Sequence, residues 1–143
     1  KILAADIRDF RPRGSFAGVL CAYNSLPHIT NPEELGDVLA MVRRALRAGG
    51  RFVFDLYSEA AYHDGWQGRV RVGRGAGACW LEARFDPARQ RGRTRVSWRG
   101  GAAQLDVRCY SDRELGSRLR AAGFTRLRRW HPAFDGRVYW CCA

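Results

Sequence analysis

The pattern of apolar and polar residues predicts a strand–helix–strand unit between residues 15 and 57. Residues 16–22 form a short apolar run without alternation, which is typical of a parallel strand covered on both faces. Residues 51–57 form a second such run, so the unit is predicted to be a right-handed parallel crossover. Ligands of open parallel sheets bind beyond the carboxyl ends of the strands, which directs attention to residues 21–28 and 55–57.

The segment between these two strands has the marks of a helix with defined ends. Asn31 is a favoured N-cap, Pro32 suits the first helical position, and Glu34 can complete the cap. We expect the helix to end at Gly49-Gly50, where a left-handed residue is needed. Its apolar positions recur at steps of three and four along one face, at Leu35, Val38, Leu39, Val42 and Leu46.

The character of the sequence changes after residue 57. Residues 58–68 are predicted to be an irregular connection, because Gly65 and Gly68 break any regular element. From residue 69 onward the apolar positions alternate with a period of two, which predicts an antiparallel sheet with one buried face and one face in water. The predicted strands are residues 69–72, 78–85, 94–99 and 103–110.

The two ends of the chain complete the predicted α/β fold. Residues 4–10 have the pattern of the end of a strand that runs into a loop. Ser111 and Glu114 form a second capping box, which opens a helix that ends at Gly123. Two closing strands are expected at residues 125–130 and 137–142.

Length and cysteine content narrow the class of protein. A chain of 143 residues can hold one domain with a core, with or without a small appendage. No window approaches the roughly 20 apolar residues of a membrane span, and no signal peptide is apparent. We therefore expect a cytoplasmic protein without membrane contact. The five cysteines are odd in number and form no C-x-x-C pair, which argues against a disulfide framework and against a metal site.

The formal charge of +11 raises the question of a nucleic-acid partner, because basic surfaces release counterions from phosphates. Of the 25 basic residues Lys1 is the only lysine, and the arginines are scattered among alanines and glycines. That pattern indicates a compositional bias, so solvated arginines are favoured over a phosphate-binding face.

Several segments together resemble one enzyme family. Residues 5–10, 16–29 and 46–52 are similar to the loop after the third strand, the fourth strand with its catalytic loop, and the start of the fifth strand of class I S-adenosylmethionine-dependent methyltransferases. Within them, the run Cys21-Ala22-Tyr23-Asn24-Ser25-Leu26-Pro27-His28-Ile29 resembles the glycine and sugar-amine N-methyltransferases, as does the turn Phe134-Asp135-Gly136. That group also inserts an antiparallel sheet after the fifth strand.

This resemblance implies a domain organisation, a cofactor and an activity. Residues 1–68 and 111–143 would form a partial Rossmann-like methyltransferase sheet, and residues 69–110 the antiparallel β insertion. The cofactor would be S-adenosyl-L-methionine. The activity would be methyl transfer to a small-molecule acceptor, most readily at nitrogen, and the oligomeric state stays open, with a homodimer as one alternative.

The resemblance also assigns roles to residues at the strand ends. Asp6 and Ile7 would bind the adenine, and Cys21, Ala22 and Tyr23 would flank the methionine part of the cofactor. Asn24, Asp55 and Tyr57 are candidates for binding the acceptor, and His28, Asn24 and Tyr23 for catalysis. Each has a structural alternative: Asp6 and Asp55 can cap a loop, Asn24 can serve a turn, and His28 can pack at a helix start.

An aromatic segment after the fifth strand adds one more alternative. Tyr62, His63 and Trp66 can form an aromatic wall that stabilises a cationic acceptor, or they can be the hydrophobic seam between the core and its insertion.

Two departures from the family pattern keep other functions open. The family's glycine-rich loop and ribose-binding acid are not in this sequence, so we expect a piece of a longer protein that by itself is inactive. Leu56-Tyr57 stands where glycine-methylating relatives carry an arginine for the substrate carboxylate, which argues against glycine as acceptor. The alternatives are an RNA methyltransferase that uses its arginines, and a non-catalytic remnant.

Overall fold

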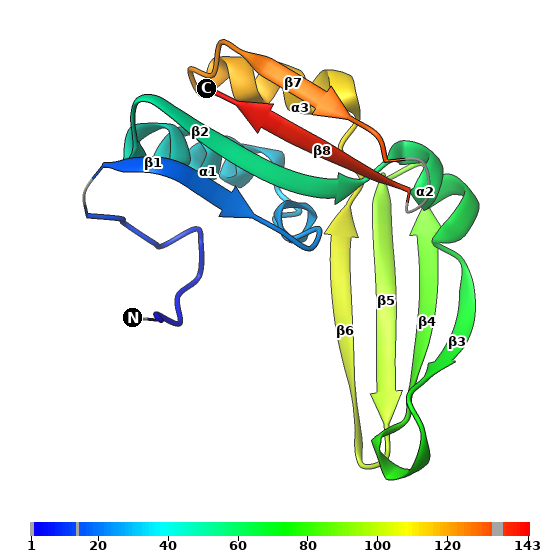
Figure 1. Cartoon of the computed structure of the whole chain (residues 1–143). Helices are drawn as coiled ribbons and strands as arrows, with labels where there is room; N and C mark the ends of the chain where they lie inside the picture. Colours follow the sequence, from blue (N-terminus) through cyan, green and yellow to red (C-terminus); the bar gives the residue numbers. More distant parts are fainter. Residues whose placement is uncertain (1, 14, 133–135) are drawn as a thin grey trace.

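The computed structural model describes residues 2–13, 15–132 and 136–143, and it arranges them as two sheets with associated helices (Figure 1). Short 3-10 helices lie at Leu26–His28 and Gly75–Gly77. The main elements in chain order are β1 (Phe16–Cys21), α1 (Pro32–Ala45), β2 (Leu46–Tyr57), α2 (Glu59–Gly65), β3 (Gly68–Val72), β4 (Cys79–Asp86), β5 (Arg91–Trp98), β6 (Gly101–Arg108), α3 (Asp112–Ala121), β7 (Leu127–Trp130) and β8 (Arg137–Cys142).

The first sheet has the strand order β1-β2-β8-β7. β1 and β2 are parallel, as the predicted crossover requires, and β8 and β7 continue the sheet in antiparallel pairing. Helices α1 and α3 lie behind this sheet in Figure 1. Phe52, Phe54 and Leu56 point from β2 into the core that these helices complete, and each is at most 3% exposed. The α/β prediction is therefore confirmed.

Within residues 2–13, 15–132 and 136–143, helices cover only one face of this sheet, which corrects the expectation for β1. Val19 and Cys21 pack against the core, whereas Leu20 on the other face is 72% exposed. The described residues therefore cover the apolar strand β1 on one face and leave its other face exposed.

The end of α1 also differs from the prediction. The Asn31 cap is confirmed, since its side chain accepts a hydrogen bond from the Glu33 amide at 2.9 Å. The helix ends at Ala45, however, and Leu46 already has an extended backbone. Gly49 has φ +72°, and a Cβ on Gly50 would lie 2.9 Å from the Phe16 carbonyl oxygen. The two glycines thus let the chain approach β1 closely instead of ending the helix.

The second sheet is an antiparallel meander in the order β3-β4-β5-β6 (Figure 1). Its strands match the predicted ones with small shifts at their ends. The expectation of one buried face is wrong for most of the sheet's length, because the part of the chain that the structure describes covers only the end beside α2. Phe85 and Val107 there are 7% and 2% exposed, whereas Val70 and Leu105 are 55% and 46% exposed.

The segment between the sheets is a helix, not the irregular connection that its glycines predicted. The Ser58 hydroxyl accepts a hydrogen bond from the Ala61 amide at 3.1 Å and caps α2. Tyr62 is fully buried against Phe85, Val107 and Cys109. Tertiary packing of Tyr62 stabilises this short helix, so the helix forms although its last residue is Gly65.

The remaining expectations concern the ends of the chain. Among residues 2–13 no strand forms; the amides of Asp9 and Phe10 donate to the Asp6 carbonyl in a turn, so only the predicted loop is present. The cap of α3 is confirmed, with the Ser111 hydroxyl 3.1 Å from the Glu114 amide. Of the predicted turn, Phe134 and Asp135 lie outside the described residues.

Candidate active site

The carboxyl ends of β1 and β2 meet at one edge of the first sheet. Cys21 pairs with Phe54 in the parallel register, so the residues that follow each strand are neighbours. The backbone amide of Asn24 donates to the Asp55 carboxylate at 3.2 Å. The two segments that the sequence singled out therefore lie next to each other at this edge of the sheet, which is where ligands of parallel sheets bind.

The loop after β1 has an unusual backbone. Tyr23 and Asn24 have φ of +63° and +54°, a left-handed conformation that costs non-glycine residues about 1 kcal/mol or more each. Their side chains diverge, since Tyr23 is 83% exposed and Asn24 is 5% exposed. Consecutive residues in this conformation are typical of functional loops that surrounding contacts hold in place.

The Asn24 side chain provides such contacts. Its amide oxygen accepts a hydrogen bond from the Tyr57 backbone amide at 3.0 Å, and its amide nitrogen donates to the Tyr62 hydroxyl at 3.4 Å. Asn24 thereby joins the end of β1 to the end of β2 and to α2. Burial raises the pKa of Tyr62 well above its ordinary value, so its hydroxyl stays protonated.

Asp55 is the charged group at the centre of this edge. It is 4% exposed and forms an ion pair with Arg137 at 2.7 Å. Arg137 lies opposite Tyr57 in the pairing of β2 with β8, and its guanidinium is 5.1 Å from the Tyr57 ring centre and 5.7 Å from that of Tyr23. Burial by itself lowers the Arg137 pKa. The hydrogen bond that Arg137 donates to Asp55 and the nearby charges of Tyr57 and Asp55 together outweigh burial, so the Arg137 pKa is raised overall.

These groups line a hollow of about 480 Å³ on the open face of the sheet. Its wall combines aromatic rings with a charge pair that is already neutralised internally. A hollow of this kind suits an apolar or cationic group against the ring faces, with polar recognition at one end. The lining residues are Ala22, Tyr23, Asp55, Tyr57, Arg137 and Tyr139.

Other predicted site residues lie beside this hollow or away from it. Cys21 is half-buried at the end of β1, and burial, followed by the charge of Asp55, raises its thiol pKa. His28 is exposed on the 3-10 helix and does not line the hollow, so its role as a base stays a prediction. Trp66 packs edge-on against Tyr57 with ring centres 5.4 Å apart, which supports the wall from behind.

Asp6 and Ile7 belong to the turn before β1. The Asp6 carboxylate accepts two hydrogen bonds from the Arg8 side chain, at 2.6 and 3.0 Å, and these lower its pKa to about 2. Arg8 also contacts Glu34 on α1 at 3.3 Å, and Ile7 packs against the core. This turn is therefore tied to α1, and it does not line the hollow.

Arg137 and Tyr139 are the site residues that the sequence did not identify. The available signal was a charged residue at the start of an otherwise apolar strand. Their place in the hollow depends on the antiparallel pairing of β8 with β2, which no local pattern encodes.

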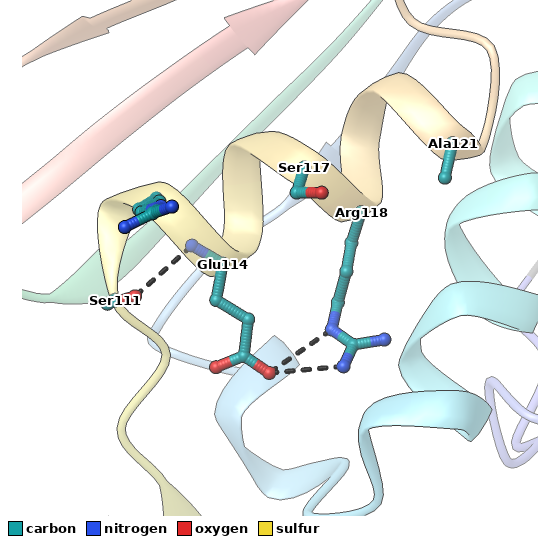
Figure 2. A pocket seen from close by; sticks show the side chains of 6 residues that line it. Ser111, Glu114, Ser117, Arg118 and Ala121 are labelled. Atoms are coloured by element: carbon teal, nitrogen blue, oxygen red, sulfur yellow. Dashed lines mark hydrogen bonds and ion pairs between the residues drawn. The ribbon is translucent and has the colours of Figure 1, made fainter.

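A second hollow, of about 470 Å³, lies on α3 and has a structural explanation (Figure 2). Figure 2 shows Glu114 and Arg118 paired along the helix, at 3.1 Å. Arg118 also donates to the Pro32 carbonyl at 2.8 Å, which links α3 to the start of α1. Because these charged groups satisfy one another, the hollow is not a candidate site.

The described residues also bear on membrane and metal binding. They contain no helix with both the length and the apolar character that crossing a membrane requires. Within residues 2–13, 15–132 and 136–143 no group of three His, Cys, Asp or Glu side chains is placed to hold a metal ion.

Comparison with known proteins gives a result only at the level of structure. No protein-family model and no curated protein matches the sequence. Among solved structures, an S-adenosylmethionine-dependent methyltransferase from Clostridium acetobutylicum superposes with a TM-score of 0.84 at 17% identity, covering 98% of this chain and 63% of that one.

Two further similar structures act on sugars according to their names. The amino pentose methyltransferase CalS10 from Micromonospora echinaspora has a TM-score of 0.71 at 17% identity, covering 96% of this chain and 62% of its own. The sugar N-methyltransferase KedS8 from Streptoalloteichus has a TM-score of 0.69 at 20% identity, covering 95% and 60%. This chain thus spans about three fifths of their length, and over that span it has the fold of the S-adenosylmethionine-dependent methyltransferases.

Proposed function

We propose that this chain forms the acceptor side of an S-adenosylmethionine-dependent methyltransferase that acts on a small molecule, at nitrogen. The observation that carries the proposal is the aromatic hollow at the joined ends of β1 and β2. In the similar structures the named acceptors include amino sugars, which supports nitrogen as the methylated atom. Location in the cytoplasm stays a prediction of the sequence.

The residues of the hollow fit an adenosyl sulfonium. The exposed ring of Tyr23 and the rings of Tyr57 and Tyr139 offer faces that stabilise a positive charge. S-adenosyl-L-methionine would supply an electrophilic methyl group. The acceptor nitrogen's lone pair would form the new bond to that carbon as the sulfur–carbon bond breaks, and the nitrogen would give up a proton. The chain's task is to orient the acceptor and receive that proton.

We assign these roles to residues by position. Cys21, Ala22 and Tyr23 flank the methionine part of the cofactor, and Asp6 and Ile7 take the adenine. In the proposed roles, Asp55 and Tyr57 orient the acceptor. Asn24 acts as a positioning residue, because its side chain is hydrogen-bonded to the Tyr57 backbone amide and to the Tyr62 hydroxyl.

Filling the hollow tests this proposal. Isothermal titration of the full-length protein with S-adenosylhomocysteine should give binding heat, and Ala22→Trp should abolish that heat. Ala22→Trp should also abolish the methylation of amino sugars, which mass spectrometry measures. Ala121→Trp is the matched control, because Ala121 is also exposed and lines the α3 hollow of similar volume. Absence of binding heat at millimolar ligand, or equal losses in both variants, would remove the assignment.

RNA as the acceptor is a second candidate, which one surface favours. The polar face of the second sheet carries Arg69, Arg84, Arg93 and Arg95, with Trp80 40% exposed beneath Arg69. Arginines beside an exposed indole can hold a nucleic-acid strand. Affinity for RNA should then fall steeply as salt rises, and an affinity that does not change with salt would dismiss this candidate.

A further inference from the structure

Two buried tyrosines flank the second sheet in the sequence and reach the loop that joins β1 to α1. Tyr62 lies on α2 before β3, Tyr110 follows β6, and each is at most 3% exposed. We call residues 22–31 the β1–α1 loop. The Asn24 side-chain amide donates to the Tyr62 hydroxyl at 3.4 Å, and the Tyr110 hydroxyl donates to the Ile29 carbonyl at 2.5 Å. Two separate parts of the loop are therefore tied to the segment that carries the second sheet.

The second sheet and its packing fix where these two hydroxyls lie. The Tyr62 ring packs against Phe85 of β4, with ring centres 5.5 Å apart. Tyr110 follows Cys109, whose amide donates to the Gln90 carbonyl at 2.9 Å and so extends the pairing of β5 with β6. The strand β6 lies against the 3-10 helix of the loop, near the place where the two sheets meet (Figure 1). Because packed side chains have little room to move, the loop is held by groups whose positions are set outside it.

The β1–α1 loop needs such external support. Tyr23 and Asn24 have left-handed backbones, which persist only where surrounding contacts hold them. Hydrogen bonds inside the loop, such as that from the Ile29 amide to the Leu26 carbonyl at 2.9 Å, form turns but do not fix the loop against its neighbours. Ile29 is 5% exposed, so loss of the Tyr110 hydroxyl would leave a buried carbonyl without that donor.

We propose that the second sheet positions the β1–α1 loop through Tyr62 and Tyr110, which makes both tyrosines positioning residues for the methyl transfer; this inference rests on the proposed function. Ala22 and Tyr23 of the loop line the hollow together with Asp55 of β2, whereas none of the described residues that line it belongs to the second sheet. Methyl transfer between two bound molecules depends on their alignment, and a misplacement of about 1 Å can cost about a hundredfold in rate. The second sheet thus acts on the reaction from outside the hollow.

Kinetic measurements on the full-length protein test the proposal. Tyr110→Phe and Tyr62→Phe each remove one hydroxyl and keep the ring. Each variant should lower kcat for methylation of an amino sugar about tenfold or more, because the loop loses its alignment. KM for the acceptor should change less than about twofold, because the proposed acceptor-orienting residues Asp55 and Tyr57 belong to β2. Since both hydroxyls hold one loop, the double variant should lose less than the product of the two single losses.

Amide hydrogen exchange followed by NMR gives a second readout that needs no cofactor. In Tyr110→Phe the Ile29 amide, which lies in the loop, should exchange about tenfold faster or more relative to the amides of α1, which report on wider opening of the fold. In Tyr62→Phe the same acceleration is expected at the Tyr57 amide, because this amide donates to the Asn24 side chain that Tyr62 holds.

The matched control is Phe124→Leu. Phe124 is 1% exposed and belongs to the same core cluster as Tyr110, but its side chain has no hydroxyl to bond the loop. This variant should therefore keep kcat and the relative exchange rate of the Ile29 amide within about twofold of the unmodified protein. Circular dichroism at the assay temperature checks that each variant is folded.

Three outcomes would overturn the proposal. They are an unchanged kcat in both tyrosine variants, a fall in kcat without faster exchange in the loop, and equal effects in the Phe124 variant. Failure of the proposed function has a different result: the unmodified protein would transfer no methyl group, while the exchange measurements would still show whether the two hydroxyls hold the loop.

Discussion

At the scale of single residues, Asn24 shows how a predicted site residue can act through others. Its backbone amide and both side-chain atoms are engaged by Asp55, Tyr57 and Tyr62. The residue that the motif offered for direct contact with an acceptor is 5% exposed. Its contribution is therefore to set the geometry of the hollow.

Replacing this amide should cost stability. Asn24→Ala leaves the partly buried Tyr57 amide without its acceptor and puts alanine in a left-handed conformation, so we expect the free energy of unfolding to fall by about 2–4 kcal/mol. Urea denaturation measures this. Tyr23→Ala, at the neighbouring left-handed position but with an exposed ring, should change it by less than about 1 kcal/mol. Similar losses in both variants would show that the amide contacts are not responsible.

At the scale of elements, the joint between α2 and the second sheet depends on one close approach. A Cβ on Gly92 would lie 2.8 Å from the Trp66 ring nitrogen and 2.8 Å from a Val107 methyl group. Val107 is part of the buried cluster around Tyr62, and Trp66 packs against that cluster, so neither neighbour can move away freely.

Gly92→Ala should therefore destabilise the chain by about 1–3 kcal/mol through overpacking. Near-ultraviolet circular dichroism should show the change around Trp66, and urea denaturation should give its size. Gly77→Ala is the control: that site has open space and an ordinary φ, so the substitution should be close to neutral. An equal and small effect at both glycines would contradict the tight packing at β5.

The elements show which kinds of local signal were reliable. The caps at Asn31 and Ser111 predicted helix starts correctly, because a cap is a contact between residues two or three apart. Glycine was misleading in two places. Gly49-Gly50 serves an approach to β1, and Gly65 ends a helix that Tyr62 anchors. In both cases a tertiary contact decided the outcome.

At the scale of the whole molecule, buried thiol and phenol groups make the free energy of unfolding depend on pH in the alkaline range. Burial raises the pKa of Cys109, Cys142 and Tyr110 to about 12 each. In the unfolded chain thiols lose their proton near pH 9, so between about pH 9 and 12 the unfolded state binds fewer protons than the folded state. Stability must then fall as pH rises through this window.

The two thiols together should lower the free energy of unfolding by about 3 kcal/mol at pH 10 relative to pH 7. Urea denaturation at several pH values measures this slope. Cys109→Ala should reduce the slope, whereas Cys79→Ala, at a half-buried thiol, is the control. Equal stability at pH 8 and pH 10 would contradict the burial of these thiols as the cause.

The sequence by itself determined most of the elements and their order, with α2 as the exception, because periodicity and helix caps depend on residues that are close neighbours in the chain. Only the tertiary structure decided how the hollow is built. Asp55 meets Asn24 across 31 positions and Arg137 across 82, through strand registers that no local pattern specifies. Tertiary structure also decided that the apolar side of the second sheet stays uncovered, because alternation encodes which side chains share a face but not what packs against that face.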